Sequence, residues 1–441
     1  MPMKFKLLPL SFLISGLCIT SFSQTVYNLN DCIRIALDAN FSILISRNAE
    51  NIAANNYTLG NAGFLPSIDL SGRHNGSVSN ISQNFRDGSS NETNGVHNTS
   101  TSALVNADLT IFRGFSVQTS YKKLNELKQI GELNTRMSVE NLIADIVSGY
   151  YNYVQQVEIL NNIKYALSLS KERLRIDEDR YVLGSSSKLQ VLQSRVYVNA
   201  DSSRLSRQYE IVRSSCIRLN ELMAVEDLTR HFVTSDTVIK INPDLIFEKL
   251  LNDALNQNTG LLIAARNKTI SEYDYKLIKS RAYPYLNASS GYNYSFNDYS
   301  TGNMQNQGSR GMNYGLTLGI NIFDGLNQRR NIKNSSIEMN NKELRYREIE
   351  QGVRADLITI YNAYSNYLRL VSLEQQNLQT AAENLEIAME RYKLGSLSGI
   401  ELREVQKSLL DAKDSLISVE YQAKLAEVSL MLISGNITDY Y

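Results

Sequence analysis

The chain has 441 residues, of which 45 are lysine or arginine and 45 are aspartate or glutamate, so its formal net charge is zero. A neutral chain carries no electrostatic signature of a nucleic-acid partner or of a strongly charged membrane surface. The three histidines, His74, His97 and His231, are scattered and lack the spacing of metal ligands. The sequence therefore predicts no nucleic-acid binding, no metal site and no cofactor.

Residues 1–23 have the pattern of a secretory signal peptide. Lys4 and Lys6 precede an apolar run from Leu7 to Phe22, and we expect cleavage after Ser23. The run is shorter than the roughly 20 apolar residues of a membrane-spanning helix. No other stretch approaches that length, so the mature chain is either soluble outside the cytoplasm or crosses a membrane as β-strands.

The rest of the chain contains the same module twice. Residues 180–187 read Arg-Tyr-Val-Leu-Gly-Ser-Ser-Ser and recur at 391–398 as Arg-Tyr-Lys-Leu-Gly-Ser-Leu-Ser, a shift of 211 (391 minus 180). The shift holds without a gap from residue 112 to residue 219. A repeat of this length is a whole supersecondary assembly and not a short solenoid unit. We expect a first repeat at 24–223, a linker at 224–243 and a second repeat at 244–441.

Each repeat is predicted to begin with a helical segment, at 28–62 and at 244–281. Asn40 matches Asn258, and an Ala-Leu pair precedes both by the same distance. Cys32 lies in the first segment and Cys216 in a later helix, and we expect two buried thiols, with a disulfide between them as the alternative.

Two strands follow in each repeat, at about 66–82 and 100–112 and at about 284–298 and 311–323. The last strand shows the clearest alternation of apolar and polar residues, with Met312, Tyr314, Leu316, Leu318, Ile320 and Ile322 on one face. We expect extra residues in the loop of the first hairpin. The strands have about the length of transmembrane β-strands.

Four strands are too few for a soluble sandwich and too few to close a membrane barrel, since small barrels need about eight strands. The open edges must be completed by other copies of the chain. The sequence therefore predicts an oligomer of at least two copies, without fixing their number.

The strands lead into long helices, at about 114–182 and 325–393. Apolar residues recur every seven positions in both helices, and neither helix contains proline, so each can span roughly 100 Å at 1.5 Å per residue. Helices returning along them are expected at about 188–223 and 399–434.

The repeated motif marks the turn between each long helix and its returning helix. Gly184 and Gly395 stand where a left-handed C-terminal cap is expected. Ser187 with Gln190, and Ser398 with Glu401, read as capping boxes that begin the returning helices. Each repeat is therefore predicted to contain a helical hairpin.

These features together resemble the TolC-like outer-membrane efflux proteins. The resemblance covers essentially the whole mature chain and includes Phe-x-Gly sequences at 112–114 and 323–325 and the Arg-Tyr-x-x-Gly turns. It implies a mainly α chain with a membrane β-barrel part, a homotrimer with a 12-stranded barrel in the outer membrane, and an α-helical barrel in the periplasm. It also implies a periplasmic adaptor protein and an inner-membrane transporter of RND or ABC type as partners, and it places the linker in the equatorial region of the helical barrel.

The resemblance implies that the turns are adaptor-docking sites. The family pattern of a hydrophobic residue, glycine and a small or apolar residue is matched by Leu183, Gly184 and Ser185 and by Leu394, Gly395 and Ser396. The alternative is that the glycines only cap helices.

The resemblance also implies a gate in the second repeat. Glu401 and Glu404 match the family's acidic positions, lie three residues apart on one helix face, and would form two carboxylate rings in a trimer, favouring cations. The alternative is that both residues only stabilise the first turn of their helix. The first repeat has Gln190 and Gln193 at the equivalent positions.

Tyr392 matches a tyrosine that in the family helps to hold the entrance shut. Gln190 occupies the position of that tyrosine's acidic partner, and Leu397 replaces an arginine of the same closing contact. The sequence therefore departs from the family pattern of this closing contact at two positions.

Three other functions fit the sequence less well. An exported enzyme lacks support, because we find no nucleophile elbow, no phosphate-binding loop and no clustered carboxylates outside the turn. A secreted coiled-coil structural protein would explain the heptads but not the strands, and a solute-specific porin would explain the strands but not the long helices. Within the resemblance, a type I protein-secretion duct remains an alternative to small-molecule efflux.

Overall fold

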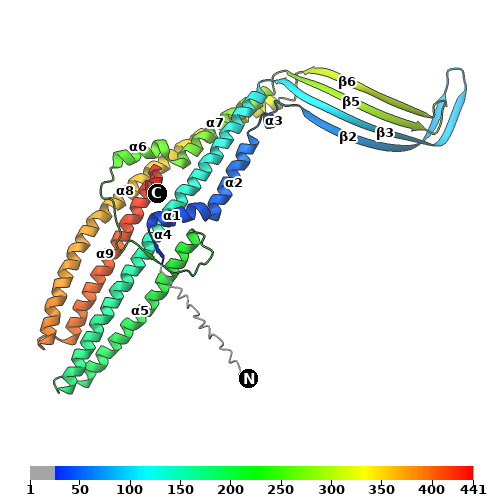
Figure 1. The fold of residues 1–441 in the computed structure, drawn as a ribbon. Coiled ribbons are helices and arrows are strands. Elements are labelled where there is room, and N and C mark those ends of the chain that lie inside the picture. The colour runs from blue at the N-terminus through cyan, green and yellow to red at the C-terminus, as the bar shows by residue number, and fades with distance from the viewer. Residues whose placement is uncertain (1–24, 441) are drawn as a thin grey trace, which may run out of the picture.

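The computed structural model describes residues 25–440, so the expected signal peptide lies outside the described residues. The first repeat contains β1 (Thr25–Tyr27), α1 (Leu29–Ala39), α2 (Phe41–Asn56), α3 (Leu59–Ala62), β2 (Ser67–Asn84), β3 (Ser90–Arg113), α4 (Ser116–Val182) and α5 (Lys188–Leu222). The rest contains β4 (Phe232–Thr234), α6 (Phe247–Gln257), α7 (Thr259–Ser280), β5 (Tyr285–Tyr299), β6 (Asn306–Gly319), α8 (Asn327–Lys393), α9 (Gly399–Ser434) and the 3-10 helix η1 (Ile437–Tyr440). Figure 1 shows an elongated helical bundle with a sheet projecting from one end.

The projecting sheet is antiparallel, in the order β2-β3-β5-β6. Its first hairpin reaches farther than its second, because β3 pairs with β5 only from Asn98 onward, while Ser90 already pairs with Asn84 of β2. Within residues 25–440, β2 and β6 each have one neighbouring strand. Each therefore leaves one backbone edge open.

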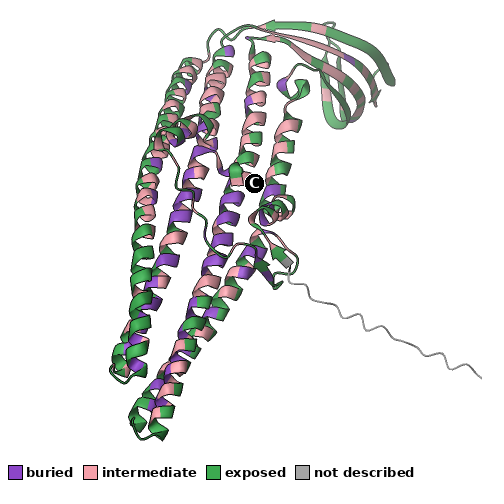
Figure 2. Ribbon diagram, turned by 60° about the vertical axis from the view of Figure 1, so that its left-hand side comes forward, coloured by how far each residue is buried: buried purple, intermediate pink, exposed green. Residues whose placement is uncertain are grey.

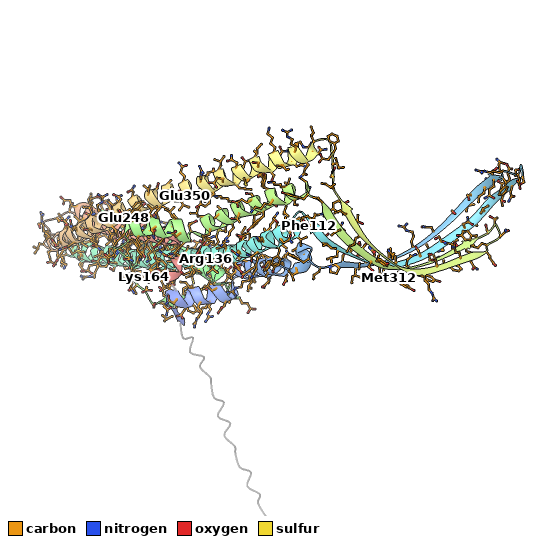
Figure 3. The ribbon with its side chains drawn as sticks, turned by 90° about the horizontal axis from the view of Figure 1, so that it is seen from above. Phe112, Arg136, Lys164, Glu248, Met312 and Glu350 are labelled. Atoms are coloured by element: carbon orange, nitrogen blue, oxygen red, sulfur yellow. The ribbon has the colours of Figure 1, made fainter. Side chains whose placement is uncertain are left out.

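The sheet has one apolar face. Leu286 pairs with Leu318 and Tyr292 with Met312 on this face, whereas Asn287 pairs with Thr317 on the other. Figure 3 places Met312 within the sheet and Phe112 at its junction with the helices. Leu318 and Met312 are exposed, so nothing within the described protomer covers the apolar face at these positions.

Two predicted strand boundaries were wrong. The strand predicted at 100–112 begins at Ser90, and the extra residues assigned to a loop extend both strands of the first hairpin. Backbone ladder bonds do not require apolar alternation, so this Asn-, Ser- and Thr-rich stretch hid its strands. The strand predicted at 311–323 runs from Asn306 to Gly319. Gly319 pairs with Tyr285, the first residue of β5 after Pro284, so the ladder offers Ile320 no further partner.

The long helices α4 and α8 have 67 residues each, which corresponds to about 100 Å. They begin two residues later than predicted. α5 packs along α4 and α9 along α8, α2 and α7 pack beside other parts of the long helices, and α9 also contacts α4. The contact between α9 and α4 joins the two hairpins. In the described part of the chain, no helix is long and apolar enough to cross a membrane.

The predicted single helices at 28–62 and 244–281 are broken at equivalent asparagines. The Asn40 side chain caps α2 and donates a 2.9 Å hydrogen bond to the carbonyl oxygen of Leu222. The Asn258 side chain caps α7 and donates a 3.0 Å bond to the carbonyl oxygen of Ile433. An asparagine that satisfies backbone groups at a helix start competes with a continuous helix, which explains the break.

The junction between strand and long helix is a turn with positive φ angles. Gly114 and Phe115 have φ of 55° and 63°, and Gly325 and Leu326 have φ of 69° and 63°. A Cβ atom on Gly114 would lie 2.5 Å from the carbonyl oxygen of Ser280, whereas one on Gly325 would meet only the Asn327 side chain, at an ordinary contact distance of 3.6 Å. The first junction therefore requires glycine for two reasons and the second for one.

The largest apolar core lies where α1, α4, α5 and the linker meet. Figure 2 shows the buried positions concentrated on the helices and the sheet largely exposed. Cys32 and Cys216 are free, buried thiols in this core, as the preferred interpretation predicted, and burial raises the pKa of Cys32 to about 12. β4 in the predicted linker pairs in parallel with β1, and Phe232 accepts a 3.0 Å hydrogen bond from the Tyr153 hydroxyl.

A buried ion pair fixes the linker and the C-terminal segment to α9. Lys424 lies 2.8 Å from Glu427, and both side chains are almost fully buried. Glu427 also accepts hydrogen bonds from the backbone N–H of Asn242, at 2.9 Å, and from the hydroxyl of Tyr440. These contacts satisfy a carboxylate that would be costly to bury alone.

Candidate gate and docking site at the helical tips

The two tips, at residues 183–187 and 394–398, have the same backbone geometry. Gly184 and Gly395 adopt φ of 76° and 79°. The N–H of Ser185 donates to the carbonyl of Arg180 at 2.8 Å, and the N–H of Gly184 donates to Tyr181 at 3.0 Å. The second tip repeats both bonds. This is the Schellman motif, which explains why glycine follows the long helix in each repeat.

The serines of the docking motif have a structural role that sequence reasoning missed. The hydroxyls of Ser185 and Ser396 each donate a 3.1 Å hydrogen bond to the last-turn carbonyls of Arg180 and Arg391. The leucines have no such role, because Leu183 and Leu394 are 80% and 82% exposed. Exposed leucines at both tips are the feature that capping leaves unexplained.

Glu401 acts as the acidic member of a capping box, as the alternative predicted. Its carboxylate accepts a 2.9 Å hydrogen bond from the N–H of Ser398, which lowers the pKa of Glu401. Gln190 makes the corresponding contact with Ser187 at 3.3 Å. The Glu401 carboxylate keeps its negative charge in the cap, and its side chain remains exposed beside the exposed Glu404. Gln193 donates a 3.2 Å hydrogen bond to the Tyr197 hydroxyl.

Tyr392 has an acidic partner, but not at the position that the sequence pointed to. Its hydroxyl donates to Asp177 of α4, a carboxylate that is 3% exposed and also accepts a bond from Ser194. Gln190, expected at the partner position, is used in its capping box instead. Burial raises the pKa of Tyr392, and the hydrogen bond to Asp177 raises it further. The hydroxyl therefore stays protonated and holds α8 against α4.

Two arginines reinforce this contact between the hairpins. The guanidinium of Arg180 lies 4.8 Å from the centre of the Tyr392 ring and donates to the carbonyl oxygens of Tyr392 and Lys393. Arg403 of α9 forms a bidentate pair with Asp201 of α5, at 2.9 and 3.0 Å. Both hairpins are thus joined by charge-assisted hydrogen bonds near the tips.

Alignment of the two copies with each other would have pointed to Asp177, Asp201 and Arg403. At a shift of 211, Asp177 corresponds to Ala388 and Asp201 to Ala412, while Arg403 corresponds to Leu192. A residue that is charged in one copy and apolar at the aligned position of the other copy indicates that the charge is used in a contact between the two copies. Among the described residues, no group of three or more His, Cys, Asp or Glu side chains could hold a metal ion.

The chain is similar to known outer-membrane channels in sequence and in fold. A sequence profile of the outer membrane efflux protein family matches residues 32–224 and 250–436. The chain is 23% identical over 314 residues to outer membrane protein TolC of Vibrio cholerae, covering 68% of this chain and 69% of the relative. A membrane protein from Pseudomonas aeruginosa matches the fold with a TM-score of 0.77 at 16% identity, covering 92% and 93% of the two chains. The Campylobacter jejuni CmeC outer membrane channel matches with a TM-score of 0.75 at 18% identity, covering 92% and 85%.

Fold and matches together define an outer-membrane channel protein that is built from two unlike copies of one module. Because the profile matches most of the chain, the protein belongs to the outer membrane efflux protein family, which confirms the resemblance seen in the sequence. It is an outer-membrane protein of a family of channels and not of enzymes.

Proposed function

We propose that three copies of this chain form a continuous duct through the outer membrane and the periplasm. The observation that supports the proposal is a four-stranded sheet with two open edges that continues into helical hairpins of about 100 Å. Pairing β2 of one copy with β6 of the next would give twelve strands, enough to close a barrel. The exposed apolar face, which carries Leu318 and Met312, would then face lipid.

The duct would receive its substrates from a periplasmic adaptor and an inner-membrane transporter of RND or ABC type. We propose that the adaptor contacts the tips through Leu183 and Leu394, because these side chains are exposed and nothing in the cap requires them. Small-molecule efflux is the preferred use, with type I protein secretion as the alternative. A secreted coiled-coil protein is not favoured, because the sheet would have no function in it.

The docking proposal is tested by replacing Leu183 and Leu394 with aspartate. Exposed side chains contribute little to folding, so both variants should reach the outer membrane at wild-type levels. Their cross-linking to the adaptor should fall by about 10-fold, because a charge would replace an apolar contact at the interface centre. Val238→Asp, an exposed position in the linker, is the control. Undiminished cross-linking of both leucine variants would refute tip docking.

We further propose that Glu401 and Glu404 form the gate, with Tyr392 holding it shut. In the trimer the two glutamates would form stacked carboxylate rings that attract cations. The first copy supplies the matched variant, since Gln190 makes the same capping box without charge. Glu401→Gln with Glu404→Gln should therefore remove the rings while keeping the cap.

In planar-bilayer recordings, this double variant should lose most of its cation preference and conduct more current per channel. Glu210→Gln removes an exposed carboxylate from α5, away from the tips, and should change neither quantity. Wild-type conductance and selectivity in the double variant would rule out the glutamates as the gate.

A further inference from the structure

A cavity of about 280 Å³ lies between the two hairpins, just behind the tips. Arg173 and Asp177 of α4 line it from the first repeat, and Tyr392 and Gly399 line it from the second. It therefore lies at the contact that joins α4 to α8 and α9. Tyr392 lines one side of it, but neither the proposed gate nor the docking motif uses the space itself.

Arg173 is the unusual member of this cavity. It is 1% exposed, its Nη1 donates to the carbonyl oxygen of Gly399 at 3.4 Å, and its guanidinium lies 4.5 Å from the centre of the Tyr197 ring. Among residues 25–440, its Nε and Nη2 atoms are buried without a hydrogen-bond partner. These two N–H groups form one edge of the guanidinium, the parallel pair that matches the two oxygens of a carboxylate.

Among residues 25–440, Arg173 forms no ion pair with a carboxylate, although the nearby charge of Asp177 favours its charged form. Asp177 lines the same cavity, but its two oxygens are taken by Ser194 and Tyr392. Asp201 is paired with Arg403. Burial lowers the pKa of Arg173, and the neighbouring Arg403 lowers it further. Among the side chains at this contact that are not exposed, three guanidinium groups, those of Arg173, Arg180 and Arg403, lie near two carboxylates, those of Asp177 and Asp201.

Two helix N-termini also lie at this cavity, and the carboxylate of Glu401 caps the one that belongs to α9. Gln190 in the first turn of α5 and Gly399 at the start of α9 both line the cavity. The helices have 35 and 36 residues, so the N-termini of two long helices line the same cavity as Arg173.

We propose that this cavity binds a small carboxylate anion, toward which Arg173 turns its buried Nε–Nη2 edge, so that both oxygens accept hydrogen bonds from it. The anion bridges the hairpins, because Arg173 belongs to α4 and the α9 N-terminus belongs to the second repeat. Binding of the anion would favour the closed arrangement of the tips. The binding step does not depend on the duct function, so either proposal can fail without the other.

The test is a saturation-transfer NMR titration of the purified full-length protein with acetate, at low salt. The wild type should bind acetate saturably. Arg173→Met should weaken binding at least about 10-fold, and Arg173→Lys, which keeps the charge but loses the parallel N–H pair, should weaken it too. Arg175→Met is the control, because Arg175 is exposed and pairs only with Glu172 and Asp179. Circular dichroism checks that each variant keeps its helices.

A peptide with blocked ends and a single central glutamate forms the second arm of the test. Saturable acetate binding that depends on Arg173 supports the proposal. Absence of acetate binding by the wild type, or wild-type affinity for acetate in both Arg173→Met and Arg173→Lys, overturns the proposal and leaves a cavity that holds only water. Binding of the peptide without binding of acetate also overturns it, because the carboxylate would then belong to a protein partner.

Discussion

At the residue scale, the most consequential contact is the hydrogen bond from Tyr392 to Asp177. It joins the second hairpin to the first at a buried site, and the guanidinium of Arg180 lies over the tyrosine ring. A hydrogen bond to a buried carboxylate stabilises a closed state by about 1.5–3 kcal/mol. The proposed gate therefore has a closing contact inside each protomer, in addition to any contact between protomers.

Replacing Tyr392 with phenylalanine should weaken the closed state. The loss of this bond would shift the ratio of closed to open channels by about 10-fold or more, since 1.4 kcal/mol corresponds to a factor of ten. Single-channel open probability measures the shift. The control is Tyr181→Phe, the equivalent tyrosine of the first copy, which is 47% exposed. Equal open probabilities in Tyr392→Phe and the wild type would show that this contact does not hold the tips.

Sequence reasoning reached some of these residues and missed others for a physical reason. Glu401 and Gln190 were predictable because a capping box is a local pattern. Asp177 and Arg173 were missed because their partners are more than two hundred residues away in the chain. Family resemblance placed the acidic partner of Tyr392 at Gln190, whereas here the carboxylate comes from α4.

At the element scale, the two copies share their backbone but differ in how tightly neighbouring elements approach. The junction at Gly114 lies against the carbonyl oxygen of Ser280, while the junction at Gly325 has no such neighbour. Both glycines have positive φ. The strain of adding a side chain should therefore differ between two positions that the sequence treats as equivalent.

Gly114→Ala should reduce the yield of folded oligomer more than Gly325→Ala does. Positive φ costs alanine about 1–2 kcal/mol at either site, and only Gly114 adds a clash with backbone. The amount of heat-resistant oligomer in outer-membrane fractions measures both effects. Equal yields for the two variants would contradict the difference in packing.

The periodic elements were the ones that the sequence predicted well. Heptads without proline placed α4 and α8 within two residues of their observed starts. The polar end of the first β-hairpin was not predictable from alternation, because Asn, Ser and Thr occupy both faces there. The breaks at Asn40 and Asn258 were not predicted, because they depend on carbonyls at the ends of α5 and α9.

At the scale of the whole molecule, the described protomer leaves strand edges and an apolar face of its sheet uncovered. Its sheet has open edges at β2 and β6, and exposed apolar residues line one face. Its two hairpins, by contrast, are already joined near the tips by Tyr392 and Arg403. In the proposed duct, the duplication supplies two unlike walls of a tube, which further copies would close.

The proposed duct depends on the number of copies, which native mass spectrometry of the detergent-extracted oligomer measures. We expect a single species with three times the mass of the mature chain, which gives twelve strands from four per copy. A monomer or a dimer would supply four or eight strands from the same sheet and would contradict the proposed duct.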